Sequence, residues 1–201
     1  QFSTSLESLG LTVSTGRVVD FRAKGSLLDN PSPEAAPLIY PTHFCGGFIK
    51  WPKDDSRKPN AIAINTHTID CLLPRGNYVL VKRFSTKEEK RRIVAAVYDG
   101  AHITAPKVGF ENHLNYYHAN GRGLSLILAK GLAAFLNSTL VDQYFRNFNG
   151  HTQVNAPDLR SFRYPPPEDS ESPGPNIGDV FLVQCGPDRP CEVAVMAVAP
   201  N

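Results

Sequence analysis

The length, composition and charge of the chain describe a soluble globular protein and exclude a membrane protein. Its 201 residues are 41% hydrophobic and 20% charged, with a formal net charge of +2, which is ordinary for one sizeable domain with its own core. Apolar stretches are too short to cross a bilayer, and the first residues contain no basic, apolar leader. We therefore expect a cytoplasmic location and no membrane partner. The missing initiator Met indicates a fragment of a longer protein.

The four cysteines, Cys45, Cys71, Cys185 and Cys191, are too few and too scattered for a disulfide framework in a chain of this size. We expect reduced thiols, as in a cytoplasmic protein. The spacing of Cys185 and Cys191 differs from that of a zinc knuckle, so we predict no metal site.

The first half of the chain is rich in predicted strands. Short runs of β-branched and aromatic residues predict strands over 11–13, 17–21, 37–40, 48–51, 60–65, 70–73, 77–84 and 92–98. The last two are the most β-branched, and the polar stretch 85–90 separates them. Ser85 and Glu88 also form a capping-box pattern that permits a helix over 86–98. A hairpin is favoured because the apolar run at 93–98 is continuous and β-branched.

The second half is dominated by one predicted helix over about 123–148. Apolar residues recur there at steps of three and four, which places them on a single face that belongs in a core. Gly150 is a typical helix end. The polar loop 150–155 follows, and Asn155 with Asp158 three residues later predicts the start of another short helix.

The expected fold is α+β: a mixed, largely antiparallel sheet region with the 123–148 helix packed on it. Residues 1–165 form the predicted domain, and the Pro-rich stretch 166–176 is a predicted linker. The acidic extension 177–201 is predicted to form a hairpin from strands at 179–183 and 192–197.

The small net charge hides an asymmetry along the chain. Residues 165–201 contain six acidic residues and one basic residue, a net charge of −5, so residues 1–164 carry +7. Basic residues are densest between Arg75 and Arg92. Cations on one surface neutralise phosphates and release counterions, which supplies most nonspecific DNA affinity. A basic run is also typical of a solvated hairpin, and both interpretations stay open at this point.

Polar and basic side chains in the predicted turns and loops are the candidate DNA contacts. Asn and Gln pair bidentately with adenine and Arg with guanine, while hydroxyl, imidazole and ammonium groups reach phosphates or base edges. The candidates are Ser14, Thr15, Gly16, Arg17, Lys58, Asn60, Lys82, Arg83, Arg91, Arg92, His113, Asn115, His151, Thr152, Gln153 and Asn155. Those in the loop after the long helix are the best placed to read bases. An ordinary polar connection between helices has the same composition.

Several segments in order resemble one known family. The strings LAAFLNSTLVDQYFR at 132–146, GHTQVN at 150–155, DLR at 158–160 and YP at 164–165 resemble the C-terminal target-recognition region of adenine-specific (N6) DNA methyltransferases. The relevant enzymes are the TaqI-like and Eco57I-like members of restriction-modification systems. Upstream segments such as VSTGRVVDFR at 13–22 and GNYVLVKRF at 76–84 are similar in the same order. The resemblance covers residues 8–166 and implies sequence-specific binding of double-stranded DNA.

The catalytic signature of that family is absent from this sequence. Its members carry an Asn-Pro-Pro-Tyr/Phe motif and a glycine-bearing loop for S-adenosylmethionine, and the nearest strings, NPSP at 30–33 and YPPP at 164–167, match neither. The resemblance therefore implies a recognition fragment that is not itself an enzyme and holds no cofactor. S-adenosylmethionine would bind the parent's own methyltransferase domain, which would be the partner of this fragment.

Three alternatives to a methyltransferase recognition fragment remain open. The specificity subunit of a multisubunit restriction system has recognition domains that end in a similar Leu-Asn-Ser helix. A metal-dependent nuclease would use Asp70 with Glu88 and Lys90. A protein-interaction module with an incidental basic hairpin would bind DNA weakly and without sequence preference.

Overall fold

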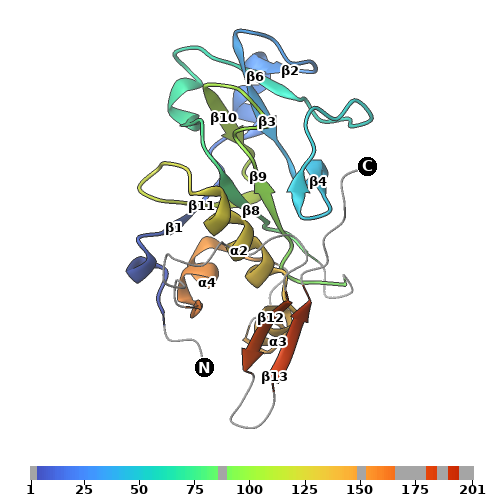
Figure 1. Cartoon of the computed structure of the whole chain (residues 1–201). Coiled ribbons are helices and arrows are strands. Elements are labelled where there is room, and N and C mark those ends of the chain that lie inside the picture. The colour runs from blue at the N-terminus through green and yellow to red at the C-terminus, as the bar shows by residue number, and fades with distance from the viewer. Residues whose placement is uncertain (1–3, 86–89, 149–152, 166–179, 185–189, 195–201) are drawn as a thin grey trace.

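The computed structural model describes residues 4–85, 90–148, 153–165, 180–184 and 190–194 (Figure 1). It is a mixed α/β structure. The strands are β1 (Thr12–Thr15), β2 (Leu27–Leu28), β3 (Ala35–Ile39), β4 (Phe44–Cys45), β5 (Phe48–Ile49), β6 (Ala61–Ala63), β7 (Leu72–Pro74), β8 (Tyr78–Lys82), β9 (Ala95–Tyr98), β10 (Lys107–Phe110), β11 (Leu114–His118), β12 (Val180–Gln184) and β13 (Pro190–Ala194). The α-helices are α1 (Asp20–Ala23), α2 (Leu126–Leu136), α3 (Thr139–Phe148) and α4 (Ala156–Ser161). Single 3-10 turns are η1 (Glu7–Leu9), η2 (Lys24–Ser26), η3 (Pro41–His43) and η4 (Ile69–Cys71).

The first sheet has the strand order β1-β11-β8-β9-β5-β4. Its pairings are antiparallel except that β5 runs parallel to β9. The β8–β9 pair, with Val81 opposite Ala95, confirms the predicted hairpin against the alternative helix. β10 and β11 are connected by the turn 111–113, and Asn120 and Gly121, both with positive φ, turn the chain after β11. Asn-Gly is the residue pair that a tight turn of this kind favours.

The second sheet has the order β2-β6-β3-β10-β7. β3 and β10 run parallel and the other neighbours antiparallel. The expected mixed, largely antiparallel sheet region is therefore present, and it is divided between these two sheets. In Figure 1 the second sheet lies at the top of the view, and α2, α3 and α4 lie lower down.

β8 is buried on both faces and separates two layers of the core. Tyr78 and Leu80 point to the second sheet, where the Tyr78 ring meets the Phe110 ring edge-on at 5.3 Å between centroids. Val79 and Val81 point to the helices. Because side chains alternate along a strand, a strand between two layers is apolar at every position. This explains the unbroken Tyr-Val-Leu-Val run of β8.

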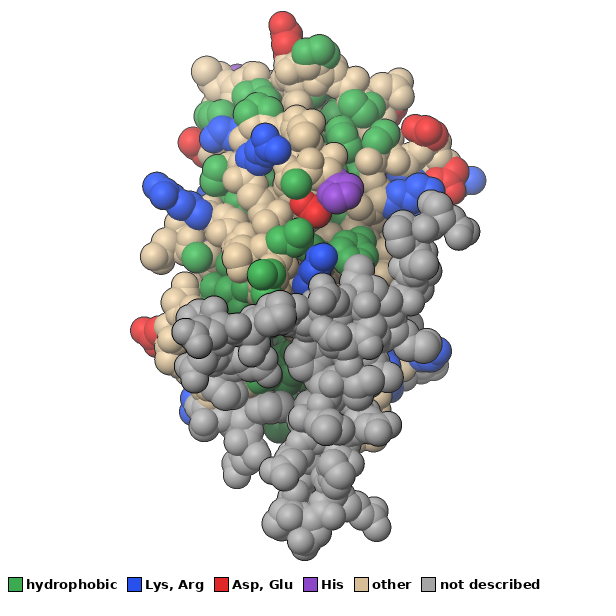
Figure 2. All heavy atoms as spheres, viewed as in Figure 1, with side chains coloured by type: hydrophobic (Ala, Val, Ile, Leu, Met, Phe, Trp, Pro, Cys, Tyr) green, Lys and Arg blue, Asp and Glu red, His purple; other side chains and the backbone are tan. Residues whose placement is uncertain are grey.

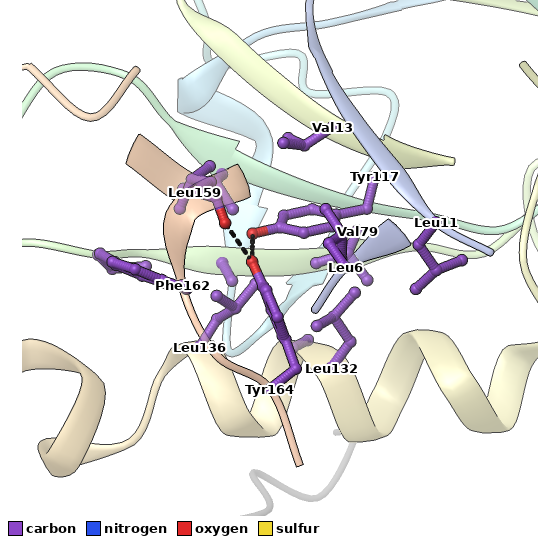
Figure 3. Packing of buried hydrophobic residues seen from close by; sticks show 14 of the residues in the cluster. Leu6, Leu11, Val13, Val79, Tyr117, Leu132, Leu136, Leu159, Phe162 and Tyr164 are labelled. Atoms are coloured by element: carbon purple, nitrogen blue, oxygen red, sulfur yellow. Dashed lines mark hydrogen bonds between the residues drawn. The ribbon is translucent and has the colours of Figure 1, made fainter. Parts of the chain in front are cut away.

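The helical layer is joined to the sheet by a buried pair of hydroxyls (Figure 3). Burial raises the pKa of Tyr117 on β11 well above its ordinary value, so its hydroxyl stays protonated. The hydroxyl lies 2.9 Å from that of Tyr164, which donates to the Leu159 carbonyl oxygen at 2.6 Å. Leu132 and Leu136 of α2 pack around this pair. Both hydroxyls are therefore satisfied inside an apolar core, as buried polar groups must be.

The prediction of one long helix over 123–148 is wrong. The helix ends at Leu136 and a second begins at Thr139. The Ser138 hydroxyl accepts the Val141 N–H at 3.2 Å, and the Asn137 side chain leaves the helix to bond β9. Asn and Ser compete for backbone groups in helix interiors and favour helix ends. Periodic apolar spacing continues across the break, which is why periodicity alone does not show it.

Not all of the apolar residues in this region belong to the core. Leu132, Leu136 and Phe145 are buried, whereas Ile127 is 59% and Tyr144 52% exposed. The prediction of a single buried face was therefore too broad.

Two further predictions have clear outcomes. The predicted strand at 17–21 is wrong, because Val18 forms only an isolated bridge with Glu111 and α1 begins at Asp20. The short helix after Asn155 is confirmed as α4, with Asp158 completing its capping box.

β12 and β13 pair antiparallel, while the division into domain, linker and extension stays a prediction. Among the described residues no helix is long and apolar enough to cross a membrane.

We expect Asn137→Ala to destabilise the protein by about 1–3 kcal/mol. The Asn137 side chain accepts the Ala95 N–H at 3.0 Å and donates to the Ala95 carbonyl at 2.9 Å, so the variant leaves both backbone groups without this partner. Urea denaturation followed by circular dichroism measures the change. Asn147→Ala, at an exposed position of α3, is the control and should change stability much less. Equal effects of the two variants would show that the bond to β9 contributes little.

Candidate nucleic-acid interface

The ends of β1 and β8 and the start of β11 lie at the same end of the first sheet. Antiparallel register places Thr15 opposite Asn115 and Lys82 opposite Leu114. The segments that leave β1 and β8 therefore flank the turn 111–113: Val18, next to Arg17, bonds Phe110 and Asn112 through its backbone, and the Arg83 N–H bonds the His113 carbonyl. The predicted site residues at the end of β1 and those between β8 and β11 therefore lie at the same end of the sheet.

Asn115 ties a third group of predicted residues to the same place. Its side-chain oxygen accepts the Thr15 hydroxyl at 3.1 Å, and its side-chain nitrogen donates to the Val154 carbonyl at 2.7 Å. The Val154 N–H in turn donates to the Arg83 carbonyl at 2.7 Å. The Asn115 side chain is fully buried. One buried amide thus holds β1, β11 and the segment before α4 in fixed relation.

The exposed part of this site is built around Phe84. The Arg83 N–H donates to the His113 carbonyl, and Arg83 Nη1 donates to the Asn112 carbonyl at 2.7 Å. The Phe84 and His113 rings lie 5.0 Å apart, and Phe84 forms a backbone bridge with Gln153. We call the set Thr15, Arg17, Arg83, Phe84, His113 and Gln153 the strand-end cluster.

The buried carboxylate of Glu111 orients His113. Its side chain is 2% exposed, and its carboxylate accepts both the His113 backbone N–H at 2.9 Å and a contact from the ring Nδ1. The imidazole is 52% exposed, so its other nitrogen can reach solvent or a ligand. Neither Glu111 nor Phe84 is among the sequence candidates. An acid two residues before a histidine in a turn was the available signal for the first, and an aromatic ending a basic strand was the signal for the second.

Arg17 contributes a positive charge on the β1 side. Burial lowers the pKa of His118, and the Arg17 charge lowers it further. His118 Nδ1 accepts the Gly121 N–H at 2.9 Å, so Nε2 carries the proton and donates to the Ser14 hydroxyl at 2.9 Å. Ser14 is therefore engaged with a neutral histidine, while the exposed Arg17 guanidinium donates to the Asp70 carbonyl at 3.3 Å.

Gly16 is needed for close packing. It is buried, and a Cβ at this position would lie 2.2 Å from the Glu111 carbonyl oxygen and 2.6 Å from that of Phe110. Its N–H donates to the Leu114 carbonyl at 2.8 Å. The glycine lets the chain leave β1 directly against the turn that carries Glu111 and His113.

Lys58, Asn60 and Lys82 lie outside the cluster. Lys58 pairs with Asp20 at 2.8 Å. Lys82 Nζ lies 5.4 Å from the centre of the Phe44 ring, which belongs to β4. Asn60 is 4% exposed and bonds the Lys53 N–H at 2.9 Å as well as the His43 ring.

His43 is a neutral structural residue of the same polar group. Burial lowers its pKa. Its Nδ1 accepts the Tyr40 N–H at 2.9 Å, which leaves Nε2 as the donor to Asn60.

Arg92 is buried and cannot contact DNA in this structure. It is 2% exposed, its Nε donates to the Ser85 hydroxyl at 3.1 Å, and its guanidinium lies 5.6 Å from the Phe145 ring centre. The Arg92 N–H donates to Asp142. DNA contact therefore does not fit the buried side chains of Asn60, Arg92 and Asn115, and their role in the described fold is structural.

The remaining candidates are distributed as follows. Arg91 is partly exposed beside Arg92. Asn155 caps α4, and its N–H donates to Asp158 at 2.9 Å. His151 and Thr152 lie outside the described residues. The expected reading loop is thus described only from Gln153 onward.

The nuclease alternative gains no support from the described part of the chain. Asp70 is exposed in η4, and Glu88 lies outside the described residues. Across the residues that the structure describes, no group of three or more His, Cys, Asp or Glu side chains is arranged to hold a metal ion.

Positive charge on the visible surface is dispersed. On the face drawn in Figure 2, Lys and Arg side chains are spread among hydrophobic and acidic ones and do not merge into one patch.

Comparison with known proteins gives two close relatives. The chain is 52% identical over 167 residues to the type II methyltransferase M.PstI of Providencia stuartii, a match that covers 83% of this chain and 33% of the relative. It is 55% identical over 161 residues to the type II methyltransferase M.BsuBI of Bacillus subtilis, covering 80% of this chain and 32% of that protein. Most of the chain is homologous to one part of type II methyltransferases.

The chain spans about a third of the length of these curated relatives. No family profile and no solved structure matches it. The resemblance to a target-recognition fold therefore stays a prediction, and the activity of the whole relatives is not carried over by the match alone.

We expect Gly16→Ala to destabilise the protein by about 1–3 kcal/mol or more, because the added methyl group would overlap rigid backbone oxygens. Urea denaturation measures the loss. Gly25→Ala is the matched control, since a Cβ there meets nothing within 4 Å and the backbone is not left-handed. If Gly16→Ala is as stable as Gly25→Ala, the close approach of residue 16 to the 111–113 turn is not required.

Proposed function

We propose that this chain binds double-stranded DNA in a sequence-specific manner, as the target-recognition part of an adenine-specific (N6) methyltransferase of a restriction-modification system. The observation that carries the proposal is the meeting of Thr15, Arg17, Arg83, His113 and Gln153 at one end of the first sheet. Homology to one third of two type II methyltransferases supports it.

The chemistry of the strand-end cluster fits this proposal. Guanidinium groups such as those of Arg17 and Arg83 bind phosphate or the guanine edge, a hydroxyl such as that of Thr15 binds phosphate, and a glutamine pairs bidentately with adenine. Gln153 precedes Val154, whose N–H and C=O are both bonded to the sheet. A reading side chain next to a fixed backbone keeps its position when DNA binds, which favours selectivity.

The methyl transfer itself is assigned to the rest of the parent protein. The two thirds of the relatives that this chain does not match would bind S-adenosylmethionine in the cytoplasm and methylate an adenine turned out of the duplex. That methyltransferase domain would be the second partner of this chain, after DNA. The names of both relatives favour this assignment over a restriction specificity subunit.

The first test is the salt dependence of DNA binding. Fluorescence anisotropy with a labelled duplex should show affinity falling as salt rises, with a log–log slope near −0.9 for each phosphate contacted. Arg17→Ala should reduce the magnitude of that slope by about one unit. Lys50→Ala is the control, because exposed Lys50 follows β5 at the far side of the sheet from β1. Affinity that is indifferent to salt, or equal loss in both variants, would contradict phosphate contact at this site.

The second test separates base reading from backbone contact. Gln153→Ala should relax the preference at one base pair by about 1–3 kcal/mol, whereas Arg91→Ala should weaken binding to all sequences alike. Selection from a randomised duplex library, followed by sequencing of the bound fraction, measures both effects. Unchanged preference in Gln153→Ala would remove this residue from base recognition.

A further inference from the structure

Phe84 is an exposed aromatic side chain that the hydrophobic core does not use. It is 44% exposed, and it packs into none of the buried apolar clusters of the described residues. Burial of apolar surface normally stabilises a fold, so a phenylalanine that ends a strand and faces solvent contributes little to folding. The Phe84 ring lies beside the Arg83 and His113 side chains, and this position suits ligand binding.

The groups around the Phe84 ring are suited to a nucleotide. The Arg83 guanidinium carbon lies 5.6 Å from the ring centre, and the His113 ring lies 5.0 Å away at an interplanar angle of 51°. The phenyl face can stack on a nucleobase, while guanidinium and imidazole groups bind the attached phosphate or the base edge. Aliphatic exposed residues such as Ile127 have no such neighbours among the described contacts.

The backbone that carries the ring is fixed on both sides. The preceding residue, Arg83, bonds His113 and Val154 through its N–H and C=O. The following residue, Ser85, is 3% exposed and donates from its hydroxyl to the Arg92 carbonyl at 2.8 Å. Phe84 itself is bridged to Gln153. A ring on a fixed backbone loses little conformational entropy when a ligand binds.

We propose that Phe84 stacks on an unstacked base of the bound DNA. This inference rests on the proposed function and names the base-stacking contact within the strand-end cluster. Bases inside a regular duplex are stacked on each other, so the ring needs a step that has been opened or kinked. A reaction on a base requires such an opening, because the target base leaves the stack. Phe84 would occupy or cover the resulting gap.

The experiment compares two labelled duplexes, one regular and one with a single-nucleotide bulge. The wild-type chain should bind the bulged duplex more tightly. Phe84→Ala should weaken that binding by about fivefold to a hundredfold, the range expected for loss of one base–aromatic stack, and should bind both duplexes alike. Phe84→Leu keeps an apolar side chain without a π face and should behave like Phe84→Ala. Thermal melting of each variant confirms that it is folded.

A spectroscopic variant reports stacking directly. In Phe84→Trp the added indole should be quenched by the bulged duplex, because stacking on a base quenches indole fluorescence. Phe21→Trp is the matched control, since Phe21 is 76% exposed and also has an arginine, Arg22, at 5.5 Å from its ring centre. Its fluorescence should change little.

The outcomes distinguish this inference from the proposed function. DNA binding that is equal in wild type and Phe84→Ala, with no quenching in Phe84→Trp, would overturn the stacking role and leave DNA recognition intact. Failure of the wild-type chain to bind either duplex would overturn the proposed function and the stacking role together.

Discussion

The geometry of the strand-end cluster depends on the buried side chain of Asn115. A primary amide offers both an acceptor and two donors, and here the acceptor takes the Thr15 hydroxyl while the donor side takes the Val154 carbonyl. A carboxylate of the same size would place an acceptor against that carbonyl, and an apolar side chain would leave both partners unsatisfied in a buried place. The Asn115 side chain, which itself touches no solvent, therefore links β1 to the segment that carries Gln153, in addition to the backbone contacts of that segment with Arg83 and Phe84.

The layered core explains why this end of the sheet is rigid enough to hold such a site. β8 packs on the second sheet through Tyr78 and on the helices through Val79. Because both of its faces are packed, the strand is held in place. Arg83 and Phe84 leave that strand directly. On the other side, Tyr117 of β11 is fixed by Tyr164 after α4 (Figure 3). Side chains mounted at the ends of such strands keep their spacing better than those on long loops.

Elements that depend on local residue patterns could be predicted from the sequence. The inward or outward orientation of individual side chains could not, because it depends on tertiary packing. The β8–β9 hairpin followed from β-branched runs, and α4 followed from the Asn155 cap. The helix break at 137–138 was hidden because apolar spacing continued through it. Arg92 carries a charge like Arg91, and nothing in composition shows that it turns inward to Ser85 and Phe145. The bounds of β11 contain part of the answer, since Asn115 lies inside a strand that is buried at every position, whereas exposed His113 precedes it.

The small number of cations in the strand-end cluster constrains how this chain would act on DNA. Nonspecific affinity grows with the number of phosphates neutralised, yet the described cluster offers only Arg17 and Arg83 as permanent cations, and Arg92 is used inside the core. A site with few cations gains selectivity from hydrogen bonds and stacking more than from charge, because phosphate contacts carry no sequence information. Such a site would by itself give modest total affinity. Tight binding would require further contacts from the part of the relatives that this chain does not span, so recognition and firm attachment would be divided between two parts of one enzyme.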